Sequence, residues 1–96
     1  MKKFQTIIHF TIDDDFAVLV PPHRTYINYL INRNIVDCYC VSMESQTVWI
    51  TINAENKDEA ENYLSQSPLF KYWDFKIEEL FAFDGQMFRL PALQLN

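Results

Sequence analysis

Six side chains of this 96-residue chain could together build a site for a small molecule. They are His9, Asp37 and Glu78, which could transfer or steer a proton, and Arg24, Tyr39 and Trp49, which could hold a substrate. His9 is the best candidate base because an imidazole titrates near neutral pH, and either carboxylate could orient it. Arg24 could bind an anion, and Tyr39 could donate a hydrogen bond to a developing enolate. These residue types suit proton transfer on a bound small molecule.

Each of these side chains also has a purely structural interpretation. Arg24 and the preceding His23 could form the solvated start of a helix. Tyr39 and Trp49 could serve as interface packing, and Glu78 could form a cross-strand ion pair. The residue types alone do not separate a catalytic site from a binding or packing surface.

Cys38 and Cys40 are the two cysteines of the chain. On a strand, residues two apart point to the same face at roughly 6.5–7 Å from each other, which disfavours a disulfide. As a metal site the pair offers two ligands, and neither histidine lies close in sequence to complete a set. We expect two buried core thiols that face the helices. The sequence also has no glycine-rich phosphate loop, metal-binding motif or hydrolase elbow, so no cofactor is expected.

The composition predicts one domain that gains by association. Apolar residues make up 49% of the chain, aromatic residues 16%, and Gly85 is the single glycine. A chain of this length buries only about 60–65% of its unfolded surface, so it is marginally stable alone. The formal net charge of −5 disfavours nucleic acid and anionic membranes as partners.

The beginning of the chain, Met-Lys-Lys, resembles the start of a signal peptide, but the next residues do not continue that pattern. Polar side chains interrupt the stretch Phe4–Ile12, and three aspartates follow it at 13–15. There is no continuous apolar region, no small-residue cleavage site and no run of 18 apolar residues. We therefore expect a cytoplasmic protein.

Hydrophobic periodicity predicts four strands and two helices. The strands are expected at Phe4–Ile12, Ile35–Met43, Thr47–Asn53 and Trp73–Phe83. Pro21 and Pro22 end a short helical turn and begin the first helix, for which Asn34 is a plausible left-handed terminator. Asn56 and Glu59 form the capping box of the second helix.

The order strand, helix, strand, strand, helix, strand is typical of an α+β, ferredoxin-like βαββαβ fold. Right-handed crossovers then give a four-stranded antiparallel sheet in the order 4-1-3-2, with both helices on one face. This domain is expected to span residues 1–83. Residues 84–96 form a tail that is too apolar for a disordered end, and we expect it to pack on a neighbouring subunit.

Two helices leave one face of such a sheet uncovered. When the more apolar phase of each strand is assigned to the helices, several large apolar side chains remain on the other face. They are Ile7, Tyr39, Val41, Trp49 and Leu80. Such a face favours a two-fold dimer or a larger homo-oligomer. The polar side chains of His9, Asp37, Lys76 and Glu78 lie among these residues, and they could either line a ligand cleft or form the rim of an interface.

The stretch 64–80 resembles the corresponding stretch of the muconolactone isomerase family. The matching residues are Pro68-Leu69-Phe70, Tyr72, Asp74, Phe75, Ile77 and Leu80. The resemblance extends over most of residues 4–83, although only this C-terminal motif is specific. It implies a dimeric α+β barrel, often assembled into larger rings. It also implies cofactor-free proton transfer that isomerises an unsaturated lactone in the breakdown of aromatic compounds.

The chain departs from that family at the positions that would hold an anionic substrate. Arg24 retains a basic residue of the first helix, whereas Asp37 stands where the family has an arginine. A carboxylate substrate would be held less well, so weak turnover of muconolactone is expected. The sequence thus predicts a cofactor-free isomerase that acts on a small cyclic or unsaturated acid. The alternative is a non-catalytic barrel that binds a small molecule or serves as an accessory protein.

Overall fold

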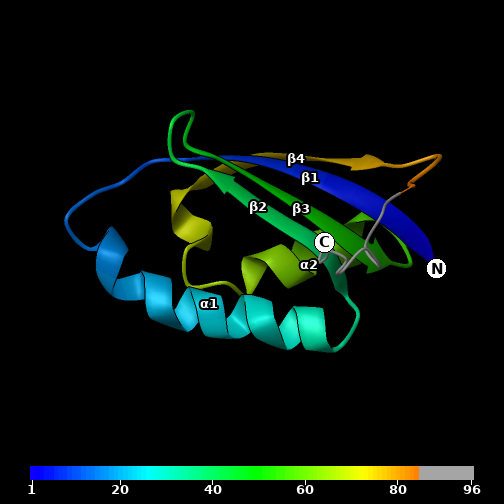
Figure 1. Cartoon of the computed structure of the whole chain (residues 1–96), viewed down its shortest axis with the longest axis horizontal. Helices are drawn as coiled ribbons and strands as arrows, with labels where there is room; N and C mark the ends of the chain where they lie inside the picture. Colours follow the sequence, from blue (N-terminus) through cyan, green and yellow to red (C-terminus); the bar gives the residue numbers. More distant parts are fainter. Residues whose placement is uncertain (85–96) are drawn as a thin grey trace, which may run out of the picture.

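The computed structural model describes residues 1–84, and its elements follow in the order strand, helix, strand, strand, helix, strand (Figure 1). The strands are β1 (Lys2–Phe10), β2 (Val36–Ser42), β3 (Thr47–Ala54) and β4 (Trp73–Glu79). The helices are α1 (Phe16–Asn32) and α2 (Lys57–Ser65), with a short 3-10 helix, η1 (Phe70–Tyr72), before β4.

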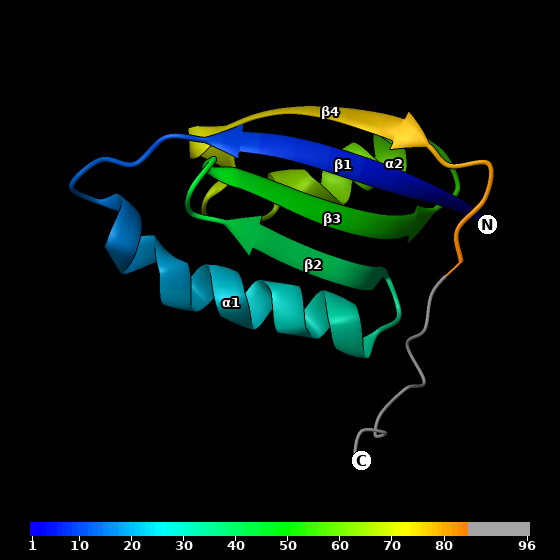
Figure 2. The same cartoon turned by 45° about the horizontal axis from the view of Figure 1, so that its top comes forward.

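The four strands form one antiparallel sheet in the order β2-β3-β1-β4. Both helices lie on the same face of this sheet, with α1 running along the β2 edge (Figures 1 and 2). The predicted α+β, ferredoxin-like fold and its strand order are confirmed. We call the face that the helices leave uncovered the outer face.

The hydrophobic core lies between the helices and the inner face of the sheet. Alternate residues of β1 and β3 point into it: Phe4, Thr6, Ile8 and Phe10 from β1, and Val48, Ile50 and Ile52 from β3. Ile27 and Leu30 of α1 and Ala60 and Leu64 of α2 close it from the other side. The period-two pattern of these strands is therefore the pattern of their burial.

Helix α1 continues through Pro21 and Pro22, so the prediction of a new helix beginning there is wrong. Each proline lacks the N–H that would bond the carbonyl four residues earlier. Those carbonyls belong to Ala17 and Val18, which are exposed and can bond water instead. The loss is therefore tolerated, and the helix gains the packing of its first turn.

Strand β2 carries a bulge at Asp37, and this overturns the predicted assignment of its faces. Val36 pairs with Ile52, but the next paired residue is Cys38, opposite Thr51. The extra residue reverses the direction of every later side chain. Tyr39 consequently points toward the helices, and Cys38 and Cys40 lie on the outer face, the opposite of the sequence prediction.

The ends of the elements follow local rules. Asn34 adopts a left-handed conformation with φ of 62° after α1, as predicted. The Asn56 side chain caps α2 by accepting a hydrogen bond from the Glu59 backbone N–H at 2.8 Å, which confirms the cap. Strand β4 ends at Glu79 rather than at Phe83, so Phe81 lies outside the sheet and is fully exposed.

The tail predicted for residues 84–96 lies outside the described residues from Gly85 onward. Within the part of the chain that is described, neither helix is long and apolar enough to cross a membrane.

Candidate functional site

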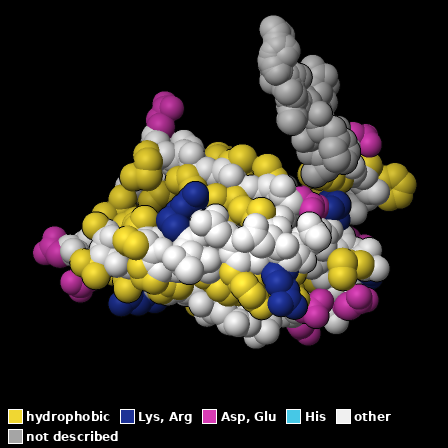
Figure 3. All heavy atoms as spheres, turned by 60° about the horizontal axis from the view of Figure 1, so that its bottom comes forward, with side chains coloured by type: hydrophobic (Ala, Val, Ile, Leu, Met, Phe, Trp, Pro, Cys, Tyr) yellow, Lys and Arg dark blue, Asp and Glu magenta, His cyan; other side chains and the backbone are white. Residues whose placement is uncertain are grey.

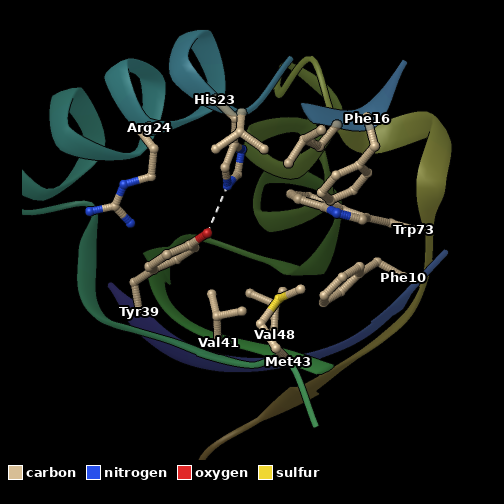
Figure 4. A pocket seen from close by; sticks show the side chains of 11 residues that line it. Phe10, Phe16, His23, Arg24, Tyr39, Val41, Met43, Val48 and Trp73 are labelled. Atoms are coloured by element: carbon tan, nitrogen blue, oxygen red, sulfur yellow. Dashed lines mark hydrogen bonds between the residues drawn. The ribbon is translucent and has the colours of Figure 1, made fainter. Parts of the chain in front are cut away.

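A pocket opens between the first half of α1 and the sheet (Figure 4). Its volume is about 160 Å³. Apolar and aromatic side chains make up most of its lining, together with three polar ones: Phe10, Phe16, Val20, His23, Arg24, Tyr39, Val41, Met43, Val48, Leu69 and Trp73. An apolar cavity of about 150 Å³ accommodates one benzene ring, so this pocket has the size of a small cyclic molecule.

Helix α1 places three residues of the pocket on one stripe. Phe16, Val20 and His23 continue at the spacing i, i+4 and i+7 to Ile27 and Leu30 in the core. The pattern would have identified His23 as a buried residue if the helix had been read through the two prolines. His23 is the site residue that the sequence analysis missed.

His23 is held at both ring nitrogens. Its Nδ1 lies 2.7 Å from Ser67 Oγ, and its Nε2 lies 2.8 Å from the Tyr39 hydroxyl oxygen (Figure 4). Ser67 is itself fixed, because its Oγ accepts a hydrogen bond from the Leu69 backbone N–H at 3.0 Å. The ring of His23 is 2% exposed and packs edge-on against Trp73 with 5.6 Å between ring centroids.

The environment keeps this imidazole uncharged. Burial, and to a lesser degree the positive charge of Arg24, lower the pKa of His23 from 6.5 to about 4. At neutral pH the ring therefore carries one hydrogen, on either Nδ1 or Nε2. The Ser67 hydroxyl can donate to Nδ1, so Nε2–H can donate to Tyr39 and leave the tyrosine hydroxyl hydrogen free.

Arg24 lies beside Tyr39 at the edge of the pocket. Its guanidinium is 5.4 Å from the centre of the Tyr39 ring, within the range of a cation–π contact. Burial raises the pKa of Tyr39, and the neighbouring Arg24 offsets part of this effect. The arginine is exposed, so it can meet an anionic group of a molecule that enters from solvent.

The rest of the wall is aromatic and apolar. The Phe10 and Phe16 rings stack with 5.6 Å between centroids, next to Trp73. At the mouth of the pocket lie Val41, near the end of β2, and Met43, just after it. Their side chains are 46% and 62% exposed. Hydrophobic side chains gather at this end of the molecule in the space-filling view (Figure 3). A site with a few polar groups in a mostly apolar concave wall is typical of small-molecule binding.

The other four predicted site residues lie away from this pocket, toward the outer face. His9 Nδ1 is 3.2 Å from Thr47 Oγ1, and His9 pairs with Asp74 on the neighbouring strand. Glu78 pairs with Gln5, four residues along β1 from His9, or about 13 Å at the rise of a strand. Trp49 is 38% exposed at the centre of the outer face.

Asp37 lies at the other end of the outer face from His9. Its carboxylate forms an ion pair with Lys3 and accepts a hydrogen bond from Asn53 Nδ2 at 3.1 Å. Lys3 and Asn53 are register partners, whereas His9 is paired with Thr47 at the opposite end of the same two strands. The structure therefore does not bring His9, Asp37 and Glu78 together. It brings together Arg24 and Tyr39, and it adds His23 to them.

A second hollow of about 210 Å³ lies beside His9 and is lined by Ile7, His9, Asp74, Phe75 and Lys76. Three of its five lining residues are polar or charged, against three of the eleven that line the pocket beneath α1. Among residues 1–84, no three His, Cys, Asp or Glu side chains are grouped so that they could hold a metal ion.

The sequence matches no protein-family model and no curated protein. The structure resembles that of 5-chloro-2-hydroxyhydroquinone dehydrochlorinase from Burkholderia phenoliruptrix AC1100, solved in complex with 2,5-dihydroxybenzoquinone. The TM-score is 0.57 at 10% sequence identity, and the match covers 88% of this chain and 97% of the other. At this identity the likeness establishes a shared fold.

Proposed function

We propose that the pocket beneath α1 binds a small cyclic or unsaturated acid and that the protein moves a proton on it without a cofactor. The observation that carries this proposal is the hydrogen bond between His23 and Tyr39 at the edge of a ring-sized apolar cavity. This pair supplies a hydroxyl group at the pocket wall that can form a hydrogen bond with an oxygen of the bound molecule.

In this proposal, Arg24 binds the anionic group of the ligand and the aromatic wall holds its ring. His23 carries its hydrogen on Nε2, and this N–H donates a hydrogen bond to the Tyr39 hydroxyl oxygen. The tyrosine hydroxyl then donates a hydrogen bond to the oxygen on which negative charge develops, while a water molecule at the mouth of the pocket takes the proton from one carbon and returns it to another. The low dielectric of the apolar wall strengthens this contact.

Two likenesses support the choice of ligand class. The sequence resembles the muconolactone isomerase family, whose reaction is a proton shift on an unsaturated lactone. The structural neighbour was solved with 2,5-dihydroxybenzoquinone, a six-membered ring with acidic oxygens. A molecule of that size agrees with a cavity of about 160 Å³.

A second candidate function is binding without catalysis. It is favoured by the low pKa of His23, about 4, because such an imidazole accepts a proton poorly at neutral pH. The catalytic roles predicted for His9, Asp37 and Glu78, and the contact predicted for Trp49, stay predictions. This proposal places the ligand beneath α1, away from all four.

We also propose that the protein is a homo-oligomer whose outer faces meet. Trp49 and Ile7 support this, since both are at least partly exposed on that face. The bulge at Asp37 makes this face less apolar than the sequence predicts, because it places Cys38 and Cys40 there in place of Tyr39 and Val41.

The ligand proposal can be tested with the chain's own fluorescence. The sequence has two tryptophans, and only Trp73 lines the pocket. In a Trp49→Phe background, Trp73 becomes the single reporter, and titration with 2,5-dihydroxybenzoquinone should quench it with saturation. The Trp73→Phe variant, which keeps Trp49, is the matched control for quenching by absorption or collision.

Removing the tyrosine hydroxyl should then weaken binding. Tyr39→Phe in the Trp49→Phe background should raise the dissociation constant about tenfold, the value of one hydrogen bond to a charged or polar group. Arg24→Ala should weaken binding by a similar factor, whereas His9→Gln on the outer face should leave it unchanged. Equal affinity in all variants would contradict this location of the site.

A further inference from the structure

The two thiols of the chain lie side by side on the outer face of β2. Cys38 Sγ and Cys40 Sγ are 3.7 Å apart, and both residues are exposed. The bulge at Asp37 creates this arrangement, because without it the two side chains would point into the core. The proposed pocket lies on the other side of the sheet, so the proposed function makes no use of the pair.

The distance between the sulfur atoms agrees with one edge of a tetrahedral metal site. With metal–sulfur bonds of about 2.3 Å, as in zinc sites, a tetrahedral angle places two thiolate sulfurs about 3.8 Å apart. An ion that prefers two ligands in a line would need about 4.6 Å at the same bond length. The pair is therefore spaced for a tetrahedral ion.

The charge of the chain favours a cation as the partner of this pair. The Asp37 carboxylate beside the pair is neutralised by its ion pair with Lys3, but the chain as a whole has a formal net charge of −5, which attracts cations.

We propose that Cys38 and Cys40 chelate one thiophilic d10 cation of the Zn²⁺ or Cd²⁺ class. Each thiol releases its proton to solvent, each sulfur donates an electron pair to the ion, and no oxidation state changes. Thiolate sulfur is the ligand type that this class of ion prefers over oxygen. The two remaining coordination positions are filled by water or by donors of a second copy of the chain.

Cadmium is the sharpest probe, because its thiolate complexes absorb in the ultraviolet by charge transfer from sulfur to metal. Reduced full-length protein, freed of metal with a chelator, should be titrated with Cd²⁺ while this absorption is followed. We expect saturation at one ion per chain, or at one ion per two chains if a second copy completes the site. Zn²⁺ should displace the signal, and both thiols should react with a thiol-reactive dye more slowly than they do in the metal-free protein at the same concentration.

The sequence makes the controls clean, because it contains no other cysteine. Cys38→Ser and Cys40→Ser should each weaken Cd²⁺ binding at least tenfold, and the double variant should lose the charge-transfer absorption. Asp74→Asn, which removes an acidic group elsewhere on the outer face, should bind as the wild type does. Circular dichroism should be the same for all variants.

Two results would overturn the proposal. The first is wild-type affinity for Cd²⁺ in either single serine variant, which would place the ion elsewhere. The second is an unchanged rate of reaction of both thiols with the dye at saturating Cd²⁺, which would show that sulfur does not ligate the ion.

Discussion

His23 shows how a residue can be misread when its element is misread. Taken as the solvated start of a helix, it is an ordinary polar side chain. Placed on the stripe that runs from Phe16 to Leu30, it becomes the buried centre of the site, bonded to Ser67 and Tyr39. Arg24 and Tyr39 could be proposed from residue type alone, because their chemistry does not depend on the exact helix start.

The lowered pKa of His23 gives a pH dependence of stability. Its pKa is about 4 in the folded protein against 6.5 for an ordinary histidine, so between these values the unfolded chain binds the additional proton. Stability that this group contributes near pH 7 is therefore lost as the pH falls toward 4. We expect a loss of about 2 kcal/mol in the free energy of unfolding between pH 7.5 and pH 4.5.

Urea unfolding of wild type and His23→Gln at both pH values isolates this effect, because glutamine does not titrate. The stability advantage of wild type over the variant should shrink by about 2 kcal/mol on acidification. Asn28→Ala, an exposed non-titrating change on the same helix, should show no such trend. A constant difference between wild type and His23→Gln would mean that His23 is not held neutral by the fold.

For β1, β3 and β4, the alternation of apolar and polar residues correctly predicts which side chains face the helices. For β2 it does not. The pattern of Ile35–Met43 is equally apolar in both phases, so a single extra residue decides which phase is buried. Lys3 and Asn53, which contact the Asp37 carboxylate, hold the bulge. Both are distant in sequence, so no local rule could reveal that Tyr39 faces the helices.

The course of α1 through Pro21 and Pro22 predicts an unusual response to substitution. Both prolines are exposed in the helix interior, where proline costs up to about 3 kcal/mol relative to alanine. Pro22→Ala should therefore stabilise the protein by about 1–3 kcal/mol in urea unfolding, since the Val18 carbonyl regains its partner. Asn28→Ala, at an exposed position of the same helix, measures the gain from helix propensity alone.

If the helix instead began at the prolines, as the sequence first indicates, they would occupy its favourable first positions. Pro22→Ala would then be neutral or destabilising. That outcome would mean that Phe16 and Val20 do not lie on the buried stripe of the helix, and the pocket that they line would not form as described.

For the whole molecule, composition and element order were sufficient to predict the fold, because few topologies fit six elements in this order.

The oligomeric state depends on the outer face, whose composition differs from the predicted one because of the bulge at Asp37. We still expect an oligomer, and light scattering at micromolar concentration should give at least twice the mass of one chain. Trp49→Glu should cause dissociation or aggregation, because it brings a charge into an apolar contact. A monomer in the wild type would contradict the proposed contact.

The resemblance to muconolactone isomerase makes a further prediction for the intact protein. Among residues 1–84, Arg24 is the one Lys or Arg side chain that lines the pocket, and losing one charged contact costs about 10- to 100-fold in affinity. We therefore expect weak or undetectable turnover of muconolactone in a direct assay. Turnover in the ordinary enzyme range, abolished by Arg24→Ala, would show that the protein catalyses this reaction.

The central claim, that the pocket beneath α1 is the ligand site, is tested most directly by a crystal structure with 2,5-dihydroxybenzoquinone bound. We expect the ring to lie between Phe16, Trp73 and Met43, with one of its oxygens within hydrogen-bonding distance of the Tyr39 hydroxyl. A ligand found instead in the hollow beside His9, with the pocket beneath α1 empty, would contradict it.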